Sequence, residues 1–209
     1  MIYSIKEIFY TVQGEGVHTG RASVFCRFSG CNLWNGREEN RKTAKCSFCD
    51  TDFVGTNGEG GGKFIDANKL AQTIISYWPS DERPFVVLTG GEPMLQVDNC
   101  LINKLKKYDC EIAIETNGTI KVPREIDWIC VSPKAGNKII QTSGDELKLV
   151  YPQTGVKPRS FEKYAFKNFS LQPMDGALKV HNTNLTLDYC MKNPRWRLSL
   201  QTHKVIGIR

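Results

Sequence analysis

FVVLTGGEP, at residues 85–93, is the stretch from which the fold is best predicted. A short continuous apolar run is typical of a strand buried on both faces, as strands of parallel sheets are. The glycines that follow allow the backbone to approach a ligand closely, although a lone Gly-Gly pair usually marks only a tight turn. We therefore expect a parallel strand with a candidate binding loop at its carboxyl end.

Further apolar strands that end in polar or glycine-rich loops occur along the chain. Asp66 is a good N-cap for the first predicted helix. Strands alternating with helices indicate an α/β fold with a parallel sheet. One domain over residues 1–209, a partial TIM-like (β/α) barrel of about six parallel strands, fits better than a complete eight-stranded barrel. Chemistry then belongs at the strand carboxyl ends. The expected strands are 22–28, 85–88, 111–115, 127–131, 146–151, 168–171 and 196–200, and the expected helices are 66–77, 98–108 and 185–192.

The charge and the chain ends exclude some classes of protein. The formal net charge is +6, but lysine and arginine are spread along the chain, unlike the basic stripe of a nucleic-acid binder. Residues 1–7 do not resemble a signal peptide, and no apolar run approaches eighteen residues. We therefore expect a cytoplasmic protein that binds neither nucleic acid nor membrane. The glycine-rich segment 55–63 is expected to be a mobile loop.

Eight cysteines favour metal binding over disulfides in such a chain. Only Cys46 and Cys49 have ligand spacing, and Cys31 lies at the end of a predicted strand, which makes 31–49 the candidate metal-binding loop. Three thiolates on a [4Fe–4S] cluster would leave one iron free for a ligand. The spacing alone fits zinc equally well, with Cys26 or His18 as fourth ligand. Four further cysteines are predicted to be small buried hydrophobes: Cys100, Cys110, Cys130 and Cys190.

Seven motifs in order resemble the radical S-adenosylmethionine superfamily and, within it, the 7-carboxy-7-deazaguanine synthase family. The resemblance covers essentially the whole chain. Most of the superfamily has three residues between the first two cysteines. The fourteen here resemble an expanded loop, 32–45, found in some members of this family. The motifs are YTVQGEG at 10–16, Cys31 with CSFCDT at 46–51, LTGGEP at 88–93, ETNGT at 115–119, VSPK at 131–134, LQPMDG at 171–176 and LQTHK at 200–204.

The resemblance implies a radical lyase of queuosine biosynthesis. It would convert 6-carboxy-5,6,7,8-tetrahydropterin to 7-carboxy-7-deazaguanine with release of ammonia. It implies a [4Fe–4S] cluster, S-adenosylmethionine and Mg²⁺ as cofactors. The implied partners are an electron donor such as flavodoxin or ferredoxin and a second copy of the chain. Two alternatives stay open: an activase that places a glycyl radical on a partner protein, and a zinc-bearing nucleic-acid-binding module.

The resemblance also implies roles for individual residues. Cys31, Cys46 and Cys49 would hold the cluster, and Thr51 would contact Mg²⁺ unless it only caps a local turn. Lys204 is a further candidate for the substrate carboxylate. Glu15, Glu115 and His203 would be catalytic. The expected cofactor-binding residues are Phe48, Cys49, Asp50, Gly91, Ser132, Pro133, Lys134, Gln172, Pro173, Met174 and Asp175, and the expected substrate-binding residues are Val12, Gln13, Gly14, Glu15, Arg27, Thr89, Glu115, His203 and Arg209.

Overall fold

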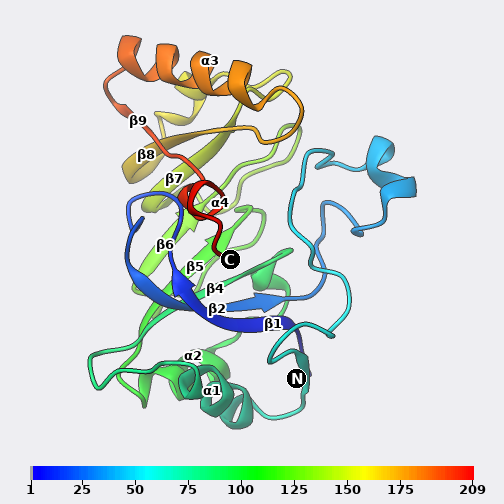
Figure 1. The fold of residues 1–209 in the computed structure, drawn as a ribbon, viewed down its shortest axis with the longest axis vertical. Helices are drawn as coiled ribbons and strands as arrows, with labels where there is room; N and C mark the ends of the chain where they lie inside the picture. The colour runs from blue at the N-terminus through cyan, green and yellow to red at the C-terminus, as the bar shows by residue number, and fades with distance from the viewer. Residues whose placement is uncertain (1) are drawn as a thin grey trace.

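A nine-stranded sheet runs through the computed structural model, which describes residues 2–209, with strand order β3-β1-β2-β4-β5-β6-β7-β8-β9 (Figure 1). From β2 to β9 all neighbouring strands are parallel, while β1 is antiparallel to β2 and β3. The partial (β/α) barrel is therefore confirmed.

The strands are β1 (Tyr3–Val12), β2 (Ala22–Phe28), β3 (Gly62–Phe64), β4 (Phe85–Gly90), β5 (Glu111–Thr116), β6 (Trp128–Val131), β7 (Ser143–Tyr151), β8 (Ala165–Pro173) and β9 (Trp196–Leu198). The helices are α1 (Ala67–Ser76), α2 (Asn99–Lys106), α3 (Lys179–Lys192) and α4 (Thr202–Ile206), with short 3₁₀ turns η1 (Glu38–Thr43), η2 (Pro93–Leu95) and η3 (Pro158–Phe161). The seven predicted parallel strands are all present. β1 and β3 were not predicted, and α3 begins six residues before the predicted helix.

Helices α1, α2 and α3 cover one face of the sheet. Figure 1 shows α1 and α2 side by side at one end of the molecule and α3 at the other. The largest apolar cluster joins α1 and α2 to β1, β2, β4 and β5, and a second cluster joins β7, β8 and β9 to the α3 side chains Tyr189 and Cys190. The Asp66 side chain accepts a hydrogen bond from the backbone N–H of Asn68, which confirms the predicted N-cap of α1.

The other face, here called the inner face, carries the polar residues. Side chains alternate between the two faces of a strand, so Val86 and Leu88 pack toward the helices while Phe85 and Val87 join an inner aromatic cluster. The residues that follow the same alternation toward the carboxyl ends are polar. They are Arg27 of β2, Thr89 of β4, Glu115 of β5, Lys148 of β7 and Gln172 of β8, and all five line one cavity.

The β1–β2 turn and α4 meet across this inner face. The backbone N–H of Thr202 donates to the carbonyl of Gly14 at 2.8 Å, and a Cβ on Gly14 would lie 2.2 Å from Nδ1 of His203. The N–H of Gly16 donates to the Ser199 hydroxyl at 2.8 Å. Only glycine at position 14 therefore allows the C-terminal segment to lie this close.

Two expectations need correction. Segment 55–63 is not a free loop, because Gly58 donates to the Lys6 carbonyl at 2.9 Å and Ile8 donates to the Glu59 carbonyl at 2.7 Å. Its glycines serve close packing, since a Cβ on Gly61 would lie 2.3 Å from the Lys6 carbonyl oxygen. Among the single cysteines, Cys110 and Cys130 are buried as predicted, but Cys100 is exposed and Cys190 only half-buried. Within residues 2–209, no helix is long and apolar enough to span a membrane.

Candidate active site

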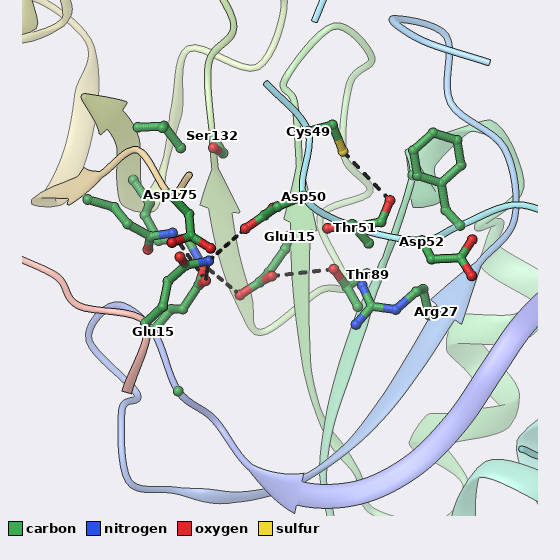
Figure 2. A pocket seen from close by; sticks show the side chains of 18 of the residues that line it. Glu15, Arg27, Cys49, Asp50, Thr51, Asp52, Thr89, Glu115, Ser132 and Asp175 are labelled. Carbon is green, nitrogen blue, oxygen red and sulfur yellow. Dashed lines mark hydrogen bonds and ion pairs between the residues drawn. The ribbon is translucent and has the colours of Figure 1, made fainter. Parts of the chain in front are cut away.

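A cavity of about 380 Å³ lies at the carboxyl ends of the parallel strands. Figure 2 shows side chains from its walls, including Cys49, Arg27, Glu115 and Glu15. The structure brings together every predicted site residue except Pro133. Pro133 is buried and does not line the cavity, and its carbonyl accepts a hydrogen bond from Gln153 Nε2 at 3.2 Å.

Three cysteines form one part of the cavity wall. Cys31, Cys46 and Cys49 are free thiols that line it together, and none of the other five cysteines does. Burial raises the pKa of the Cys31 thiol, and the backbone N–H groups of Leu33 and Trp34 oppose that rise. Burial also raises the pKa of Cys46, against the nearby Lys134 ammonium. Backbone N–H groups and a cation therefore partly offset the effect of burial, and they lie where they could stabilise the thiolates that an iron–sulfur cluster requires.

Neither candidate for a fourth zinc ligand lies near the three cysteines. Cys26 is fully buried in the core of β2, and His18 packs against Phe85 and Trp128, away from the cysteines. Among residues 2–209, no three His, Cys, Asp or Glu side chains could hold a single metal ion. A [4Fe–4S] cluster is larger, so its ligands need not converge on one point. The residues present therefore fit a three-cysteine cluster better than zinc.

A buried ion network forms another part of the wall. The Lys148 Nζ lies 2.6 Å from Oε2 of Glu15 and 3.2 Å from Oε1 of Glu115. Glu15 also accepts hydrogen bonds from Gln172 Nε2 at 3.1 Å and Gln201 Nε2 at 3.0 Å. The Lys148 side chain is only 6% exposed. Its charge is therefore balanced by the two carboxylates rather than by water.

The network keeps Glu15 ionised. Burial by itself would raise the pKa of Glu15, but the Lys148 ammonium and hydrogen bonds from Lys148 and Gln201 outweigh it and lower the pKa to about 2. Burial likewise would lower the pKa of Lys148, but Glu115 and Glu15 hold it well above its usual value. Opposite charges at this separation stabilise each other's charged forms.

The two carboxylates retain limited acceptor capacity. A carboxylate has about four lone-pair sites, and Glu15 uses three of them. Glu115 accepts from Gln13 Nε2 at 3.1 Å, from Lys148 and from the Thr89 hydroxyl at 3.3 Å. Each carboxylate therefore has about one site left for a ligand. A ligand that needs two acceptors must use both carboxylates or displace a glutamine.

Arg27 supplies a cation on a neighbouring strand. Its Nε donates to Oε1 of Glu7 at 2.8 Å, and no hydrogen bond from its two Nη groups is found among residues 2–209. Arg209 lies beside it, with its guanidinium 5.2 Å from the centre of the Phe9 ring and its main-chain oxygen accepting from the Thr11 hydroxyl at 3.0 Å. The free Nη groups can bind an anion in bidentate fashion.

Lys204 ties α4 to two other elements. Its Nζ lies 2.6 Å from Oδ2 of Asp50 and 2.6 Å from Oδ2 of Asp175. The expectation that Lys204 meets a substrate carboxylate does not hold in this arrangement, because two carboxylates already occupy the ammonium group. Asp50 and Asp175 line the cavity with it. This ion pair joins the cysteine loop to the end of β8.

The Gly-Gly turn after β4 has a structural reason different from the predicted one. A Cβ on Gly91 would lie 2.1 Å from the Gly30 carbonyl oxygen, and one on Gly90 would lie 2.3 Å from that of Phe28. The glycines are thus required first for the approach of the two chain segments. Glu92 is fully buried and accepts from the Thr116 hydroxyl and the Asn117 N–H, both at 2.7 Å. It therefore joins the ends of β4 and β5.

The polar groups around the cysteines come from later strands. Lys134 Nζ donates to the hydroxyl of Ser132 at 2.7 Å and to its carbonyl at 2.8 Å. Burial lowers the pKa of Lys134, while Cys46 and Cys49 oppose that fall. Thr51 lines the same cavity, and no hydrogen bond of its hydroxyl is found within residues 2–209. Its hydroxyl is therefore free for a ligand.

Sequence reasoning missed Lys148 and did not assign Gln201 to the site. The missed signal was the run Glu146-Leu147-Lys148-Leu149, in which charged and apolar residues alternate in a central strand. Strict alternation places the charged side chains on the inner face, where Glu146 accepts the N–H of Val17 at 3.1 Å. Gln201 stands directly beside the predicted His203 in the LQTHK motif.

Comparisons with known proteins agree with this geometry. The model of the Radical SAM superfamily matches residues 43–164. The chain is 59% identical to a 7-carboxy-7-deazaguanine synthase of Bradyrhizobium diazoefficiens and 56% identical to one of Burkholderia multivorans, each over the whole of both chains. Among solved structures it resembles QueE from Escherichia coli, with a TM-score of 0.69, 26% identity, and coverage of 97% of this chain and 95% of that one.

Proposed function

Since the chain belongs to the 7-carboxy-7-deazaguanine synthase family of the radical SAM superfamily, it is a radical enzyme of queuosine biosynthesis, and we propose that its substrate is 6-carboxy-5,6,7,8-tetrahydropterin. The product would be 7-carboxy-7-deazaguanine, with ammonia released. The family implies a [4Fe–4S] cluster and S-adenosylmethionine. The glycyl-radical activase and the zinc-bearing nucleic-acid module are therefore set aside.

One observation supports the proposal most directly: a single cavity is lined both by the three cysteines and by the Glu15–Lys148–Glu115 network. The first fits a radical-generating cofactor, and the second fits a heterocycle with hydrogen-bond donors. A pterin presents N–H groups along its amino-pyrimidinone edge. Because each carboxylate has about one acceptor site left, the two together match two donors. Arg27, with free Nη groups in the same cavity, suits the substrate carboxylate.

When bound, the cluster and S-adenosylmethionine supply the radical that removes a hydrogen atom from the substrate. Cys31, Cys46 and Cys49 would hold the cluster. Ser132 and Lys134 lie on the cysteine side of the cavity and would orient S-adenosylmethionine, together with other cavity-lining residues, Phe48, Asp50, Gly91, Gln172, Pro173, Met174 and Asp175. The walls of the cavity would surround the reacting groups and would limit access of water to the radical.

His203 and Thr51 would complete the chemistry. Burial lowers the pKa of His203, although Glu15 opposes that fall, so the imidazole is neutral near pH 7 and can accept a proton. The free hydroxyl of Thr51 would contact a Mg²⁺ that takes its other ligands from substrate and water. Release of ammonia from the substrate requires proton transfers, which His203 would assist.

The remaining partners are part of the same proposal. A flavodoxin or ferredoxin would supply the electron that the cluster requires, in the cytoplasm. A homodimer is supported by exposed apolar side chains of α3, with Val180 77% and Met191 73% exposed. Light scattering of the holoprotein tests the dimer, and a monomer at micromolar concentration would contradict it.

The decisive experiment is anaerobic incubation of the reduced holoprotein with S-adenosylmethionine and the carboxy-tetrahydropterin. We expect the deazaguanine chromophore and one ammonia per product. Glu15→Gln should still cleave S-adenosylmethionine when reduced but should bind the pterin weakly, because the amide presents a donor where an acceptor is needed. Cys46→Ala should lose both activities. Cleavage of S-adenosylmethionine by the wild-type protein without any deazaguanine would reject the proposed substrate.

A further inference from the structure

Apart from the N–H groups of Leu33 and Trp34 beside Cys31, the fourteen residues between Cys31 and Cys46 are given no role in the function proposed above. This segment, 32–45, carries η1 and extends away from the sheet at the right of Figure 1. It nevertheless returns to the ligand loop, since the N–H of Cys46 donates to the Leu33 carbonyl at 3.3 Å. The Leu33 N–H in turn lies 3.4 Å from the Sγ of Cys31. The insertion is therefore in direct contact with two of the cluster ligands.

Arg41 makes the most specific of these contacts. One nitrogen of its guanidinium, Nη1, donates to the carbonyl of Ser47 at 3.0 Å and to the carbonyl of Cys49 at 2.9 Å. These carbonyls flank the peptide between Phe48 and Cys49. A single donor group thus determines the direction of the backbone that carries Cys49.

The guanidinium is itself held in place from two sides. Its Nε donates to Oε2 of Glu38 at 2.6 Å, and its Nη2 donates to the other oxygen of the same carboxylate. Its central carbon lies over the Trp34 ring, 4.1 Å from the ring centre. Trp34 is only 7% exposed and packs edge-on against Phe53 at 5.6 Å. Arg41 therefore connects a buried aromatic pair to the cysteine loop.

We propose that Arg41 is a positioning residue for the cluster ligands and that the expanded loop serves to place it. Arg41 fixes the loop that carries Cys46 and Cys49, and it holds a permanent positive charge beside that loop. The inference rests on the cluster that the superfamily implies and not on the pterin. It therefore stands or falls separately from the proposed substrate.

The charges of the pair predict opposite effects on the cluster. Reduction adds a negative charge, which a nearby cation stabilises and a nearby anion opposes. The Arg41 guanidinium donates to the carbonyls of Ser47 and Cys49, and the Glu38 carboxylate pairs with it from outside. The positive charge of Arg41 therefore lies beside the ligand loop, and the charge of Glu38 partly cancels it.

The test uses the anaerobically purified full chain with its cluster, in three variants: Arg41→Gln, Arg41→Lys and Glu38→Gln. Midpoint potentials come from an EPR-monitored redox titration, and cluster retention comes from the rate of iron loss to an iron(II) chelator. The matched control is Arg37→Gln in the same loop. Arg37 is 71% exposed in its side chain and lies 3.8 Å from Glu39.

Arg41→Gln should shift the midpoint potential to a more negative value and Glu38→Gln to a less negative one. Arg41→Lys should keep a midpoint potential close to that of the wild type but should lose iron faster. The ammonium group keeps the positive charge, but it cannot bind the Glu38 carboxylate and the two loop carbonyls at the same time as the planar guanidinium does. For both Arg41 variants we expect roughly tenfold faster iron loss, the effect of about one charged hydrogen bond. Arg37→Gln should match the wild type in both measurements.

Wild-type potentials in Arg41→Gln and Glu38→Gln, together with wild-type iron loss in both Arg41 variants, would overturn the proposal. Equal shifts in the same direction for Arg41→Gln and Glu38→Gln would also overturn it, because loop disorder alone would then explain them. If Arg41→Gln does not fold, as circular dichroism would show, the contrast between Arg41→Lys and Glu38→Gln still decides the question.

Discussion

Loss of Lys148 should strongly destabilise this protein without removing a ligand of the cluster. Replacement by methionine keeps the length of the side chain and removes the ammonium that lies 2.6 Å from Glu15 and 3.2 Å from Glu115. Two largely buried carboxylates then lose the cation that both of them contact. Breaking a buried ion pair from one side costs about 3–5 kcal/mol.

The pKa of Glu15 gives an independent magnitude. It is lowered from 4.5 to about 2 although burial acts in the opposite direction. At about 1.4 kcal/mol per pKa unit, the contacts of Glu15, net of its burial, stabilise its ionised form by about 3.5 kcal/mol. Lys148 supplies the largest of these contacts, so we expect its removal to lower the free energy of unfolding by on the order of 3 kcal/mol at pH 8.

The loss of unfolding free energy in Lys148→Met should depend on pH in a defined direction. In the wild type the pKa of Glu15 is lowered, so its stabilisation is complete above 4.5 and is lost only as the pH falls toward about 2. Between pH 5 and 8 this group leaves wild-type stability unchanged. In Lys148→Met the pKa of Glu15 should instead lie above 4.5. The destabilisation should then be largest at pH 8 and should decrease toward pH 5, as the carboxyl takes up a proton.

Guanidinium unfolding of the anaerobic protein at equal cluster content, at pH 5, 6.5 and 8, measures this difference. The control is Lys167→Met, whose Nζ also pairs with a carboxylate, Asp145 at 2.7 Å, but whose side chain is 76% exposed. An ion pair whose lysine is exposed to solvent contributes about 1 kcal/mol or less. A deficit in Lys148→Met that is the same at all three pH values, or no larger than that of the control, would refute the reasoning.

Three further outcomes follow from single contacts. Gly91→Ala should lower the free energy of unfolding by roughly 1–3 kcal/mol and should lower the iron content. The new Cβ would lie 2.1 Å from the Gly30 carbonyl oxygen and 3.0 Å from the Cβ of Cys31. Normal iron content with wild-type stability would contradict this. Asp66→Ala should cost about 1 kcal/mol in urea unfolding, since Asp66 caps α1, and Asp66→Asn should recover most of it. Cys46→Ala should abolish the visible absorbance of the cluster, whereas Cys100→Ala, at an exposed site, should keep it.

Most of the parallel sheet was predictable because its strands are short apolar runs that end in glycine or polar turns. β1 was missed for an identifiable reason. Its pairing with β2 shifts register between Ile5 and Glu7, so the alternation that identifies a strand is interrupted there. β3 has only three residues and begins with glycine. It forms because its backbone pairs with the edge of β1.

The site was predictable to the extent that its residues stand next to one another in the chain. Cys46 and Cys49, the Gly-Gly turn and the strand-end motifs each carry their signal locally. Lys148 does not, because its partner Glu15 lies 133 residues away and only the sheet register brings them together. The steric reason for the Gly-Gly turn could not be predicted either, because the carbonyl that a Cβ on Gly91 would clash with belongs to Gly30 on another segment.

The sequence by itself therefore determined the α/β class, the cysteine loop and the family, because apolar periodicity and local motifs depend on neighbours in the chain. Tertiary structure alone decided that Lys148 holds Glu15 ionised, that Lys204 pairs with Asp50 and Asp175, and that Arg41 reaches the carbonyls of the cysteine loop. The physical reason is that charge balance and hydrogen bonding act over a few ångströms in space. Folding determines which distant segments come that close.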